Sequence, residues 1–548
     1  MIPRGSVFRA AGAIGVLATS LAIITPSSAT PPVVNTLTLS LPGPFNPCTV
    51  LDPNATPTTS AILDLIRPSA FQTTSGDNLV GEGGAIASAE LISLTPETIV
   101  YTIAPDEHWS NGDVFDASTL INWWNLERQR ASVQSDGYRD IGTLVASNSN
   151  LTLTATFAKP YAEWNLLFRD VEAPQVPLGC TWDDFDARPS LGPYQVVSAS
   201  TNRFVLVTNP SWTLDPGRFA RVVITDSRSI PANPVGYYVS YSLNVSRQAL
   251  EAVSARANIS SHIGTSSSLV EMTFGPHRPL TKRTDVREAL SLILNRQTIV
   301  DDIFGSVTFS PSPAQSALYS QGQNAYPGGS GNGPSAQSTT TTITSTNQTN
   351  ALVDCRACAI ALLNKLKFHI IASHWYTPTG QPLALRIVVG PSGLDRIVAS
   401  QIESQWTKDG ISVYVTYASS DAAAAFAAAS DNGDVAIFTR PTSTTAAYTA
   451  RSFAGPAYLD SYPSGIRNTT LNTLYTTGID IFNPVTAEST WLSLDQVVID
   501  DFWVRPLFTA PSLVEWSNTL ANVYGSISLP GLVDQVTSWT VAPLNSQS

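Results

Sequence analysis

The stretch Thr95–Trp124, TPETIVYTIAPDEHWSNGDVFDASTLINWW, is the most informative part of this chain. Its segment Ile99–Ile103 is rich in β-branched and aromatic residues and predicts a strand. Asn111-Gly112 predicts a tight turn, because both residues tolerate a positive φ at little cost. Asp116 can accept a hydrogen bond from the free N–H groups of a helix that begins at Ala117. The stretch therefore predicts a strand, a turn and a helix in close succession.

This order of strand, Trp-Ser-Asn-Gly turn and Trp-containing helix resembles the signature of the family 5 solute-binding proteins of ABC importers. These are the oligopeptide-, dipeptide- and nickel-binding proteins. Their usual form is Trp-Ser/Thr-Asp/Asn-Gly, then Thr/Ser-Ala-x-Asp and a helix with a Trp. We expect Trp109, Trp123 and Trp124 to pack the core of a small N-terminal lobe.

Two further segments follow in the order that the family has. Gly192-Pro193-Tyr194 opens a strand, Arg203–Thr208 returns, and Asn209–Trp212 forms the closing turn, which resembles the family's Gly-Pro-Tyr strand and Asn-x-x-Trp motif. Thr284–Gly305 resembles the segment Val-Arg-x-Ala-Leu-x-x-Ala-x-Asp-Arg, with Asn295-Arg296 in the Asp-Arg place. Its apolar face predicts a helix that Thr284 caps and Gly305 follows.

The second half of the chain alternates strands and helices. Residues 326–350 are low-complexity with little apolar content, so we expect a mobile loop there. The elements expected after it are a helix at Asp354–Leu366, a strand at Leu383–Val389, a helix at Asp395–Trp406, a strand at Ile411–Tyr417, a helix at Asp421–Ala429 and strands at Asp434–Phe438 and Phe502–Thr509. This alternation favours an α/β lobe with parallel strands.

The resemblance implies a complete domain plan for the chain. The fold class would be α/β, a bilobal periplasmic-binding-protein type II fold with a hinge and an extra small subdomain in lobe I. Lobe I would comprise residues 30–275 and 505–548, with the small subdomain at about 46–170, and lobe II residues 276–504. The chain would then cross between the lobes twice.

The N-terminus predicts an export signal at residues 1–29. Arg4 and Arg9 precede an apolar stretch, Ala10–Ile24, and Ser27-Ser28-Ala29 is a small-residue cleavage site. The stretch is shorter than the about 20 residues that a membrane span needs. An uncleaved anchor is the alternative, and no Cys stands at the cleavage site to form a lipobox. We therefore expect an exported protein, periplasmic, extracellular or in the cell envelope.

The four cysteines suit an oxidising compartment. Cys48 and Cys180 could form a bridge, and the family layout places both in lobe I. Cys355 and Cys358 could bridge locally, although a Cys-x-x-Cys can also be a redox or metal pair. No second pair and no His at ligand spacing accompany it, so a structural role is favoured over a metal site.

Composition and motifs argue against nucleic-acid binding and catalysis. The net charge is −12 with no basic cluster, so nucleic acid and anionic membrane are poor partners. The chain has no His-Glu-x-x-His, no Gly-x-Ser-x-Gly and no phosphate-binding Gly-x-x-x-x-Gly-Lys motif. None of the five histidines pairs at i, i+4. We expect no catalytic residues, no metal and no cofactor.

The resemblance places ligand contacts in two loops. One follows the first strand, here Pro44-Phe45-Asn46, and the other follows the Phe-Asp-x-Ala strand, here Thr439-Arg440-Pro441-Thr442. The predicted ligand-binding residues are Phe45, Asn46, Arg440, Pro441 and Thr442. Aromatic side chains from both lobes would add stacking surface.

The second loop departs from the family pattern. Oligopeptide binders carry Trp-x-x-Asp there, and the Asp pairs with the amino terminus of the peptide. This chain has Arg440 in the Trp place and Ser443 in the Asp place. A cleft-facing guanidinium would favour a carboxylate or phosphate on the ligand. Alternatively, Arg440 points to solvent or pairs with an acidic neighbour.

Two functions follow from the resemblance. The first is an exported solute-binding protein, a monomer, that captures a peptide or other small polar ligand and delivers it to ABC transporter permease subunits. The second is a non-transport protein of the same fold that acts in cell-envelope assembly or regulation. Pro68-Ser69-Ala70-Phe71 resembles a divergent actinobacterial branch in which some members have such a role.

Overall fold

The computed structural model describes residues 35–48, 57–76, 78–129, 136–174, 180–226, 236–243, 245–253, 258–305, 310–321, 325–327, 350–442, 445–454, 464–482, 484–526 and 528–542. The predicted signal peptide and most of the predicted loop at 326–350 lie outside these residues. Tyr326, the first residue of the predicted loop, is buried, and its hydroxyl accepts a hydrogen bond from the Gln315 N–H at 2.8 Å. Among the described helices, none has the length and apolar character that crossing a membrane requires.

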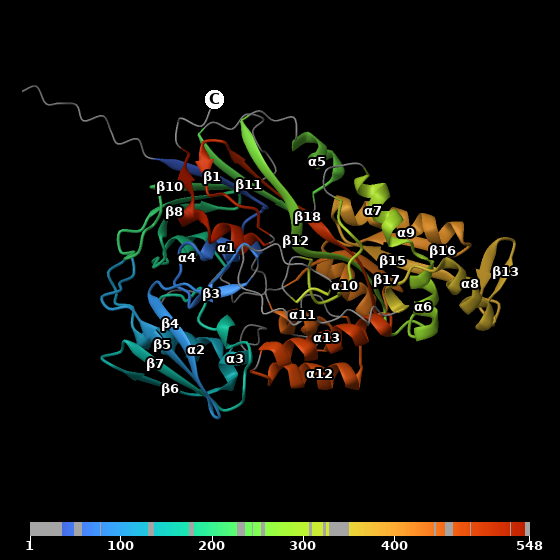
Figure 1. The fold of residues 1–548 in the computed structure, drawn as a ribbon, viewed down its shortest axis with the longest axis horizontal. Coiled ribbons are helices and arrows are strands. Elements are labelled where there is room, and N and C mark those ends of the chain that lie inside the picture. The colour runs from blue at the N-terminus through green and yellow to red at the C-terminus, as the bar shows by residue number, and fades with distance from the viewer. Residues whose placement is uncertain are drawn as a thin grey trace, which may run out of the picture. The chain divides into compact units, whose positions relative to one another are not determined.

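A ten-stranded mixed sheet is the centre of the fold (Figure 1). Its strands, in spatial order, are β16 Ser412–Tyr417, β15 Ala384–Val389, β17 Val435–Pro441, β12 Ile259–Phe274, β18 Val504–Ser517, β11 Tyr237–Leu243, β1 Thr36–Leu41, β10 Arg221–Asp226, β9 Arg203–Thr208 and β8 Tyr194–Ser200. β15 runs parallel to β16 and β17, and β1 runs parallel to β10 and β11. The predicted parallel α/β region and the hairpin β8–β9 are therefore present.

Two long strands, β12 and β18, join the two halves of this sheet. β12 pairs with β17 through its C-terminal part, whereas β18 pairs with β11 through its C-terminal part. The two strands pair with each other over most of their lengths, with an irregular register between Thr265 and Leu269. β12 was not predicted from the sequence, and only the first part of β18 was.

Each half of the sheet has its own apolar core. On the β1 side the core is built by the strands together with α1 Pro57–Leu63, α4 Trp182–Asp186 and α14 Leu529–Val533. On the β15 side the strands are covered by α6 Thr284–Ile293, α7 Arg296–Phe304, α8 Arg356–Lys365 and α9 Gly393–Lys408. α10 Asp421–Ala429 packs its alanines on β17. The remaining short elements are β2 Phe71–Thr73, β3 Leu79–Gly81, α5 Arg247–Val253, η4 Asn350–Leu352, β13 His369–Ile371, β14 His374–Tyr376, β19 Leu520–Ala521, η6 Val536–Ser538 and β20 Thr540–Val541.

The stretch Thr95–Trp124 contributes a strand to a separate four-stranded sheet, here called the subdomain sheet. It consists of β4 Ile86–Leu94, β5 Glu97–Ile103, β7 Thr152–Phe157 and β6 Ile141–Ser147, with α2 Ala117–Glu127 and α3 Asp136–Asp140 beside it (Figure 1). Gly112 has φ +89°, and Asp116 accepts the Ser118 N–H at 2.8 Å. Trp109 and Trp123 are core residues and Trp124 is partly buried against them. The predicted strand, turn, cap and helix are confirmed.

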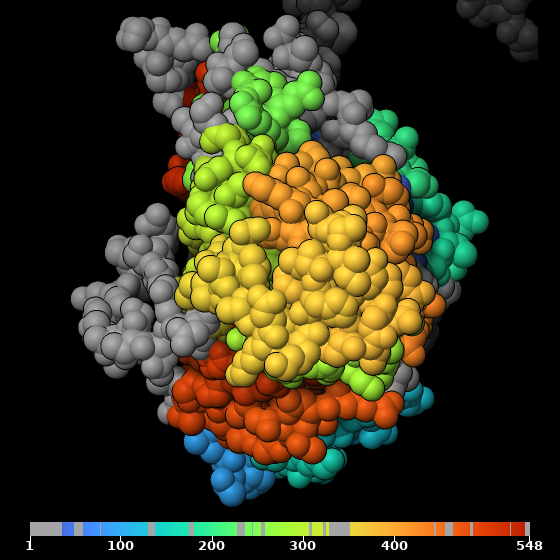
Figure 2. All heavy atoms as spheres, turned by 90° about the vertical axis from the view of Figure 1, so that its right-hand side faces the viewer, coloured from blue at the N-terminus to red at the C-terminus, as the bar shows by residue number. Residues whose placement is uncertain are grey.

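A group of three helices, here called the helical unit, was not predicted. It consists of α11 Ala446–Ala454, α12 Thr469–Ile479 and α13 Pro484–Asp500, whose core includes Leu471, Trp491 and Leu494. Figure 2 shows α12 and α13, in orange-red, on the molecular surface next to the yellow segment that holds α8. These helices are rich in Thr and Ser, so their apolar faces are narrow and hard to detect in the sequence.

The predicted helix at Thr284–Gly305 is two helices instead. Leu294 has ψ 135°, which ends α6, and the Asn295 side chain then caps α7 by accepting the Thr298 N–H. Thr284 is the first residue of α6 rather than its cap, which is Arg283. Gly305 does follow the last helical residue, with φ +56°. The apolar pattern runs through both helices because both pack against the same core.

Candidate ligand-binding site

The two predicted ligand loops follow strands whose C-terminal ends approach each other. Ser40 at the end of β1 pairs with Ser240 of β11, and Glu515 of β18 pairs with both Ser240 and Ser261 of β12. The end of β1 therefore lies level with Ser261. From the opposite direction, Pro441 at the end of β17 pairs with Ser268. Ser261 and Ser268 are therefore about 23 Å apart along β12, at about 3.3 Å per residue. In α/β proteins ligands bind beyond the carboxyl ends of strands, so the region between these two ends is the candidate site.

Arg440 is held inside the protein by an acidic partner. Its Nη2 lies 2.7 Å from Oε2 of Glu271, and its Nε donates to both carboxylate oxygens at 3.2 Å. Nη2 also donates to the Ala317 carbonyl at 2.5 Å, and the guanidinium lies 5.1 Å from the ring of Phe453. The Arg440 and Glu271 side chains are 2% and 1% exposed. The charge of Arg440 is thus already neutralised. Of the two predicted arrangements, Arg440 adopts the one in which it pairs with an acidic neighbour.

Asp495 of α13 anchors the segment that covers Arg440. Its Oδ1 accepts the N–H groups of Ala317 and Leu318 at 2.8 and 3.1 Å. Burial raises the pKa of Asp495 to about 6, while these hydrogen bonds and the charge of Arg440 lower it. The chain at 316–321 is therefore fixed over the end of β17 by two buried charged side chains, Asp495 and Arg440.

Hydroxyl groups join the same segment to the long strands. The Thr442 and Ser320 hydroxyls are 2.7 Å apart, and the Thr442 N–H donates to the Ser267 carbonyl. Thr265 Oγ1 donates to the Gln321 carbonyl at 2.7 Å. Pro441 is exposed between these buried contacts. The end of β17 thus offers neutral hydrogen-bonding groups and one exposed ring.

A pair of carboxyls lies on the other face of β17. Thr439 Oγ1 donates to Asp395 Oδ1 at 2.7 Å, and Ser392 caps α9 beside it. Burial and the neighbouring Asp395 raise the pKa of Asp421 to about 7. Gly390 makes room for the pair, since a Cβ there would lie 2.1 Å from Asp421 Oδ1. Asp421 therefore holds its proton more tightly than an exposed aspartate does.

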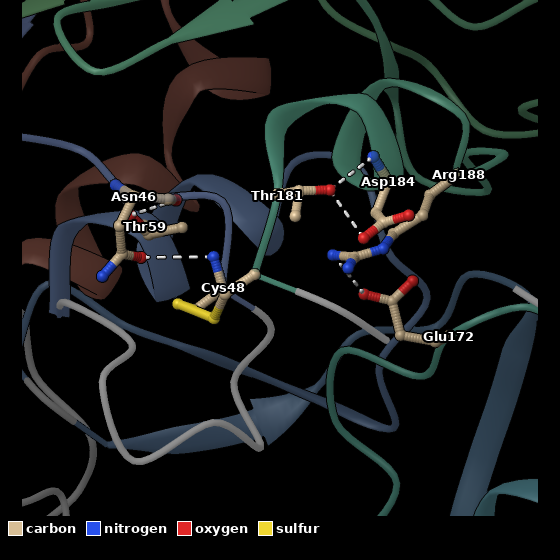
Figure 3. The surroundings of a disulfide bond; sticks show 8 residues. Asn46, Cys48, Thr59, Glu172, Thr181, Asp184 and Arg188 are labelled. Atoms are coloured by element: carbon tan, nitrogen blue, oxygen red, sulfur yellow. Dashed lines mark hydrogen bonds and ion pairs between the residues drawn. A yellow bond between two sulfur atoms is a disulfide. The ribbon is translucent and has the colours of Figure 1, made fainter. Parts of the chain in front are cut away.

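The first predicted loop is built around a disulfide (Figure 3). Phe45 is 2% exposed and its ring packs edge-on against Phe204, with centroids 5.4 Å apart. Asn46, which is partly buried, accepts the Cys48 N–H through its side-chain oxygen at 3.4 Å. Cys48 and Cys180 are bonded, with Cα atoms 4.4 Å apart, as the sequence analysis proposed. The loop is therefore tied to the chain before α4.

The second predicted pair, Cys355 and Cys358, is also bonded in the structure. It closes the first turn of α8, where the Cys358 N–H donates to Cys355 Sγ. Among the described residues no group of three or more His, Cys, Asp or Glu side chains could hold a metal ion.

A further set of buried carboxyls lies beside α1 and α14, and we call it the carboxyl cluster. Its members are Asp64, Glu82, Asp170 and Asp534, and Arg169 is the cation beside them. Burial raises the pKa of Glu82 to about 8 and the pKa values of the three aspartates above their usual range. Thr73 donates its N–H to Asp534 and Ser69 donates its N–H to Glu82. The cluster joins β2 to the C-terminal segment.

The comparison with protein families decides what this chain is related to. A family model described as bacterial extracellular solute-binding proteins, family 5, middle part, matches residues 84–463. The chain belongs to this family. The predicted family and its bilobal α/β fold are thereby confirmed, because the match covers most of the chain.

Curated relatives and a solved structure agree with this assignment. The oligopeptide-binding protein OppA of Mycobacterium tuberculosis (strain ATCC 25618 / H37Rv) is 25% identical over 296 residues, 50% of this chain and 49% of OppA. The probable monoacyl phosphatidylinositol tetramannoside-binding protein LpqW of the same strain is 28% identical over 134 residues, 23% of this chain and 21% of LpqW. The matched stretch thus spans at most about half the length of these relatives. The structure of the periplasmic EDTA-binding protein EppA has a TM-score of 0.78 and 17% identity, with 93% of this chain and 97% of EppA covered.

Sequence reasoning missed the residues that hold Arg440. Glu271 is the single charge in the apolar run Leu269–Phe274, and an isolated carboxylate in a buried strand signals a buried cationic partner. Asp495 gave no such signal, because it lies in a polar-looking helix that was not predicted. Ser443, the residue in the Asp place, lies outside the described residues.

Proposed function

We propose that this family 5 protein captures a peptide or another small polar ligand between two lobes and passes it to the membrane subunits of an ABC importer. The observation that carries the proposal is that the C-terminal ends of β1 and β17 point toward each other from opposite directions, at levels about 23 Å apart along β12. Such an arrangement lets loops from both halves of the sheet contact one ligand. The protein acts as an exported monomer and binds its ligand without chemical turnover.

The lobes of this proposal are residues 30–275 with 505–548, and residues 276–504. The separate cores on the β1 and β15 sides support the division. β12 and β18 are the two crossings, and the irregular register between Thr265 and Leu269 is the place where they can bend. Hinge residues of this kind absorb the change in backbone angles when lobes close.

Phe45, Asn46, Arg440, Pro441 and Thr442 are proposed to line or support the ligand site. Pro441 is exposed, so it can touch the ligand directly. The guanidinium of Arg440 is already paired with the Glu271 carboxylate. Arg440 therefore supports the end of β17 rather than binding a charge on the ligand. We therefore propose that the ligand is held at this position through uncharged hydrogen-bonding groups, such as peptide amides or hydroxyls, rather than through a charged end.

Identifying the bound ligand is the direct test of this function. Protein purified from its own organism is denatured, and the released small molecules are analysed by mass spectrometry. Each recovered compound is then titrated back by calorimetry. We expect a peptide or polar compound that binds and is recovered unchanged. Conversion of the compound into a product, or a failure of every recovered compound to bind, would contradict the proposal.

One substitution connects the ligand to the end of β17. Thr442→Val keeps the volume of the side chain but removes the hydroxyl beside Ser320, so binding of the recovered ligand should weaken by about 1 kcal/mol. Thr473→Val on α12 is the matched control, because its hydroxyl only donates to the Thr469 carbonyl on an exposed helix face.

We propose as a second candidate a role in the cell envelope without transport, because LpqW, which matches 23% of this chain, is named as a probable binder of a glycolipid, a monoacyl phosphatidylinositol tetramannoside. Deleting the gene separates the two functions. Loss of labelled-peptide uptake with an unchanged envelope lipid profile supports the importer role. An altered glycolipid profile with normal peptide uptake supports the envelope role.

A further inference from the structure

The subdomain sheet and the helical unit contact each other through a short segment before η2 Trp164–Leu166. The Ala162 N–H donates to the Ile479 carbonyl at the end of α12, at 3.0 Å. Trp164 packs on the core of the subdomain sheet, whereas Ile479 packs on the core of the helical unit. The hydrogen bond therefore joins two elements that belong to different cores.

Glu163 makes a second contact between the same two parts. Its carboxylate accepts a hydrogen bond from the Ala447 N–H and lies beside the Thr445 side chain. Because α11 begins at Ala446, the Ala447 N–H is one of the groups that the helix itself cannot satisfy. A carboxylate at this position caps the helix and meets the positive end of its dipole. The cap comes from a residue nearly three hundred positions earlier in the chain.

The capped end of α11 lies close in sequence to the candidate ligand site. Ala447 follows Thr442 by five residues, so holding the start of α11 limits where the end of β17 can move. Burial raises the pKa of the Tyr319 hydroxyl, in the segment that covers Arg440, and the charges of Glu488, Asp495 and Glu163 raise it further. Glu163 therefore lies near this segment as well as near the start of α11.

We propose that Glu163 is a positioning residue that latches the subdomain sheet to the helical unit when the protein closes on its ligand. This inference rests on the proposed function, because closure has a role only in a protein that captures a ligand between lobes. Opening would break two hydrogen bonds, those of Ala447 and Ala162, and would expose the Glu163 carboxyl to water. A latch of this kind sets how long the ligand stays bound.

The charges around Glu163 make the latch depend on pH. Burial raises the pKa of Glu163 to about 7, and the hydrogen bonds and Arg451 of α11 lower it. The other groups on this side are Tyr319 and, beside that tyrosine, Glu488 and Asp495 of α13. The latched carboxyl therefore holds a proton more tightly than a hydrated one does. Latching is favoured as the pH falls below 7 and weakens as it rises, on the order of tenfold between pH 5.5 and pH 8.

Small-angle scattering of the ligand-free full chain tests the latch without knowledge of the ligand. The radius of gyration is measured at pH 5.5 and pH 8 for wild type, Glu163→Gln and Glu163→Ala. We expect wild type to expand at pH 8, Glu163→Gln to stay compact at both values, and Glu163→Ala to be expanded at both. Gln keeps an acceptor for the Ala447 N–H but cannot ionise, so it mimics the protonated latch.

Glu97→Gln is the matched control. Glu97 is also a carboxyl whose pKa burial raises to about 7, and it accepts the Tyr161 N–H at 2.7 Å, but both residues belong to the core of the subdomain sheet. This variant should expand with pH as wild type does. Hydrogen exchange of the peptide that spans 445–454 should be faster in Glu163→Ala than in Glu97→Gln.

Two results would overturn the latch. One is a Glu163→Gln variant that expands at pH 8 as much as wild type, and the other is a Glu163→Ala variant as compact as wild type at pH 5.5. Both readouts use ligand-free protein, so they stand even if no ligand is ever recovered. If the latch behaves as expected but no recovered compound binds to the protein, only the proposed function is contradicted.

Discussion

Replacing Arg440 with methionine is expected to destabilise the protein strongly. The substitution keeps most of the side-chain volume but leaves the Glu271 carboxylate without a cation in a position that is 1% exposed. Three N–O contacts within 3.2 Å and the bond to the Ala317 carbonyl are lost together. Breaking one partner of a buried pair typically costs 3–5 kcal/mol, so Arg440→Met should lower the free energy of unfolding by about that amount.

The pair is measured by a double-mutant cycle in urea, with tryptophan fluorescence as the signal. Arg440→Met with Glu271→Gln removes both charges, so the double variant should recover at least about 1.5 kcal/mol relative to the sum of the single losses. Arg283→Met is the control, because its pair with Asp285 is 42% and 37% exposed and should be worth less than about 1 kcal/mol.

Two outcomes would refute this reasoning. A loss below about 1 kcal/mol for Arg440→Met would place the pair with ordinary surface salt bridges. Strict additivity in the double variant would show that Arg440 and Glu271 do not act on each other.

Three further predictions concern the rest of the molecule. Burial in the carboxyl cluster raises the pKa of Glu82 from 4.5 to about 8. Its contribution to the free energy of unfolding should therefore be greatest below about pH 4.5 and be lost as the pH rises through 8. Glu82→Gln should reduce this loss of stability in denaturation curves taken between pH 5 and pH 9. Removing the Cys48–Cys180 bond, which closes a loop of 132 residues, should cost about 5 kcal/mol, whereas removing the local Cys355–Cys358 bond should cost about 2 kcal/mol. Equal losses in thermal melts of the double-serine variants would contradict the loop argument. Gly390→Ala would place a Cβ 2.1 Å from Asp421 Oδ1, so we expect a loss of about 1–3 kcal/mol in urea unfolding, and a stability equal to wild type would show that the carboxyl pair can move aside.

Elements with local signals were predicted well. The strand β5, the turn at Gly112 and the cap of α2 depend on contacts within a few residues, so the sequence carries them directly. α10, at Asp421–Ala429, was predicted to the residue for the same reason, since Ser420 caps a run of alanines. The family signature added the order of the elements, which local patterns alone do not give.

The break at Leu294 and the three helices α11–α13 could not be predicted in this way. Both helices of the Thr284–Gly305 region show one continuous apolar pattern, because both pack on one core, and periodicity does not record a change of direction between them. The helices of the helical unit are stabilised by burial against each other rather than by helix-forming sequence.

The sequence by itself determined the family, the local elements and the two loops that follow β1 and β17. Only the tertiary structure decided what those loops do, because the deciding partners are far apart in the chain. Arg440 could have faced a ligand or an acid, and Glu271, 169 positions away, settles its charge through the pairing of β12 with β17. Glu163 reads as an ordinary surface residue until the fold brings it to the start of α11. Strand pairing and burial create these contacts, and neither has a period or a motif that a linear sequence displays.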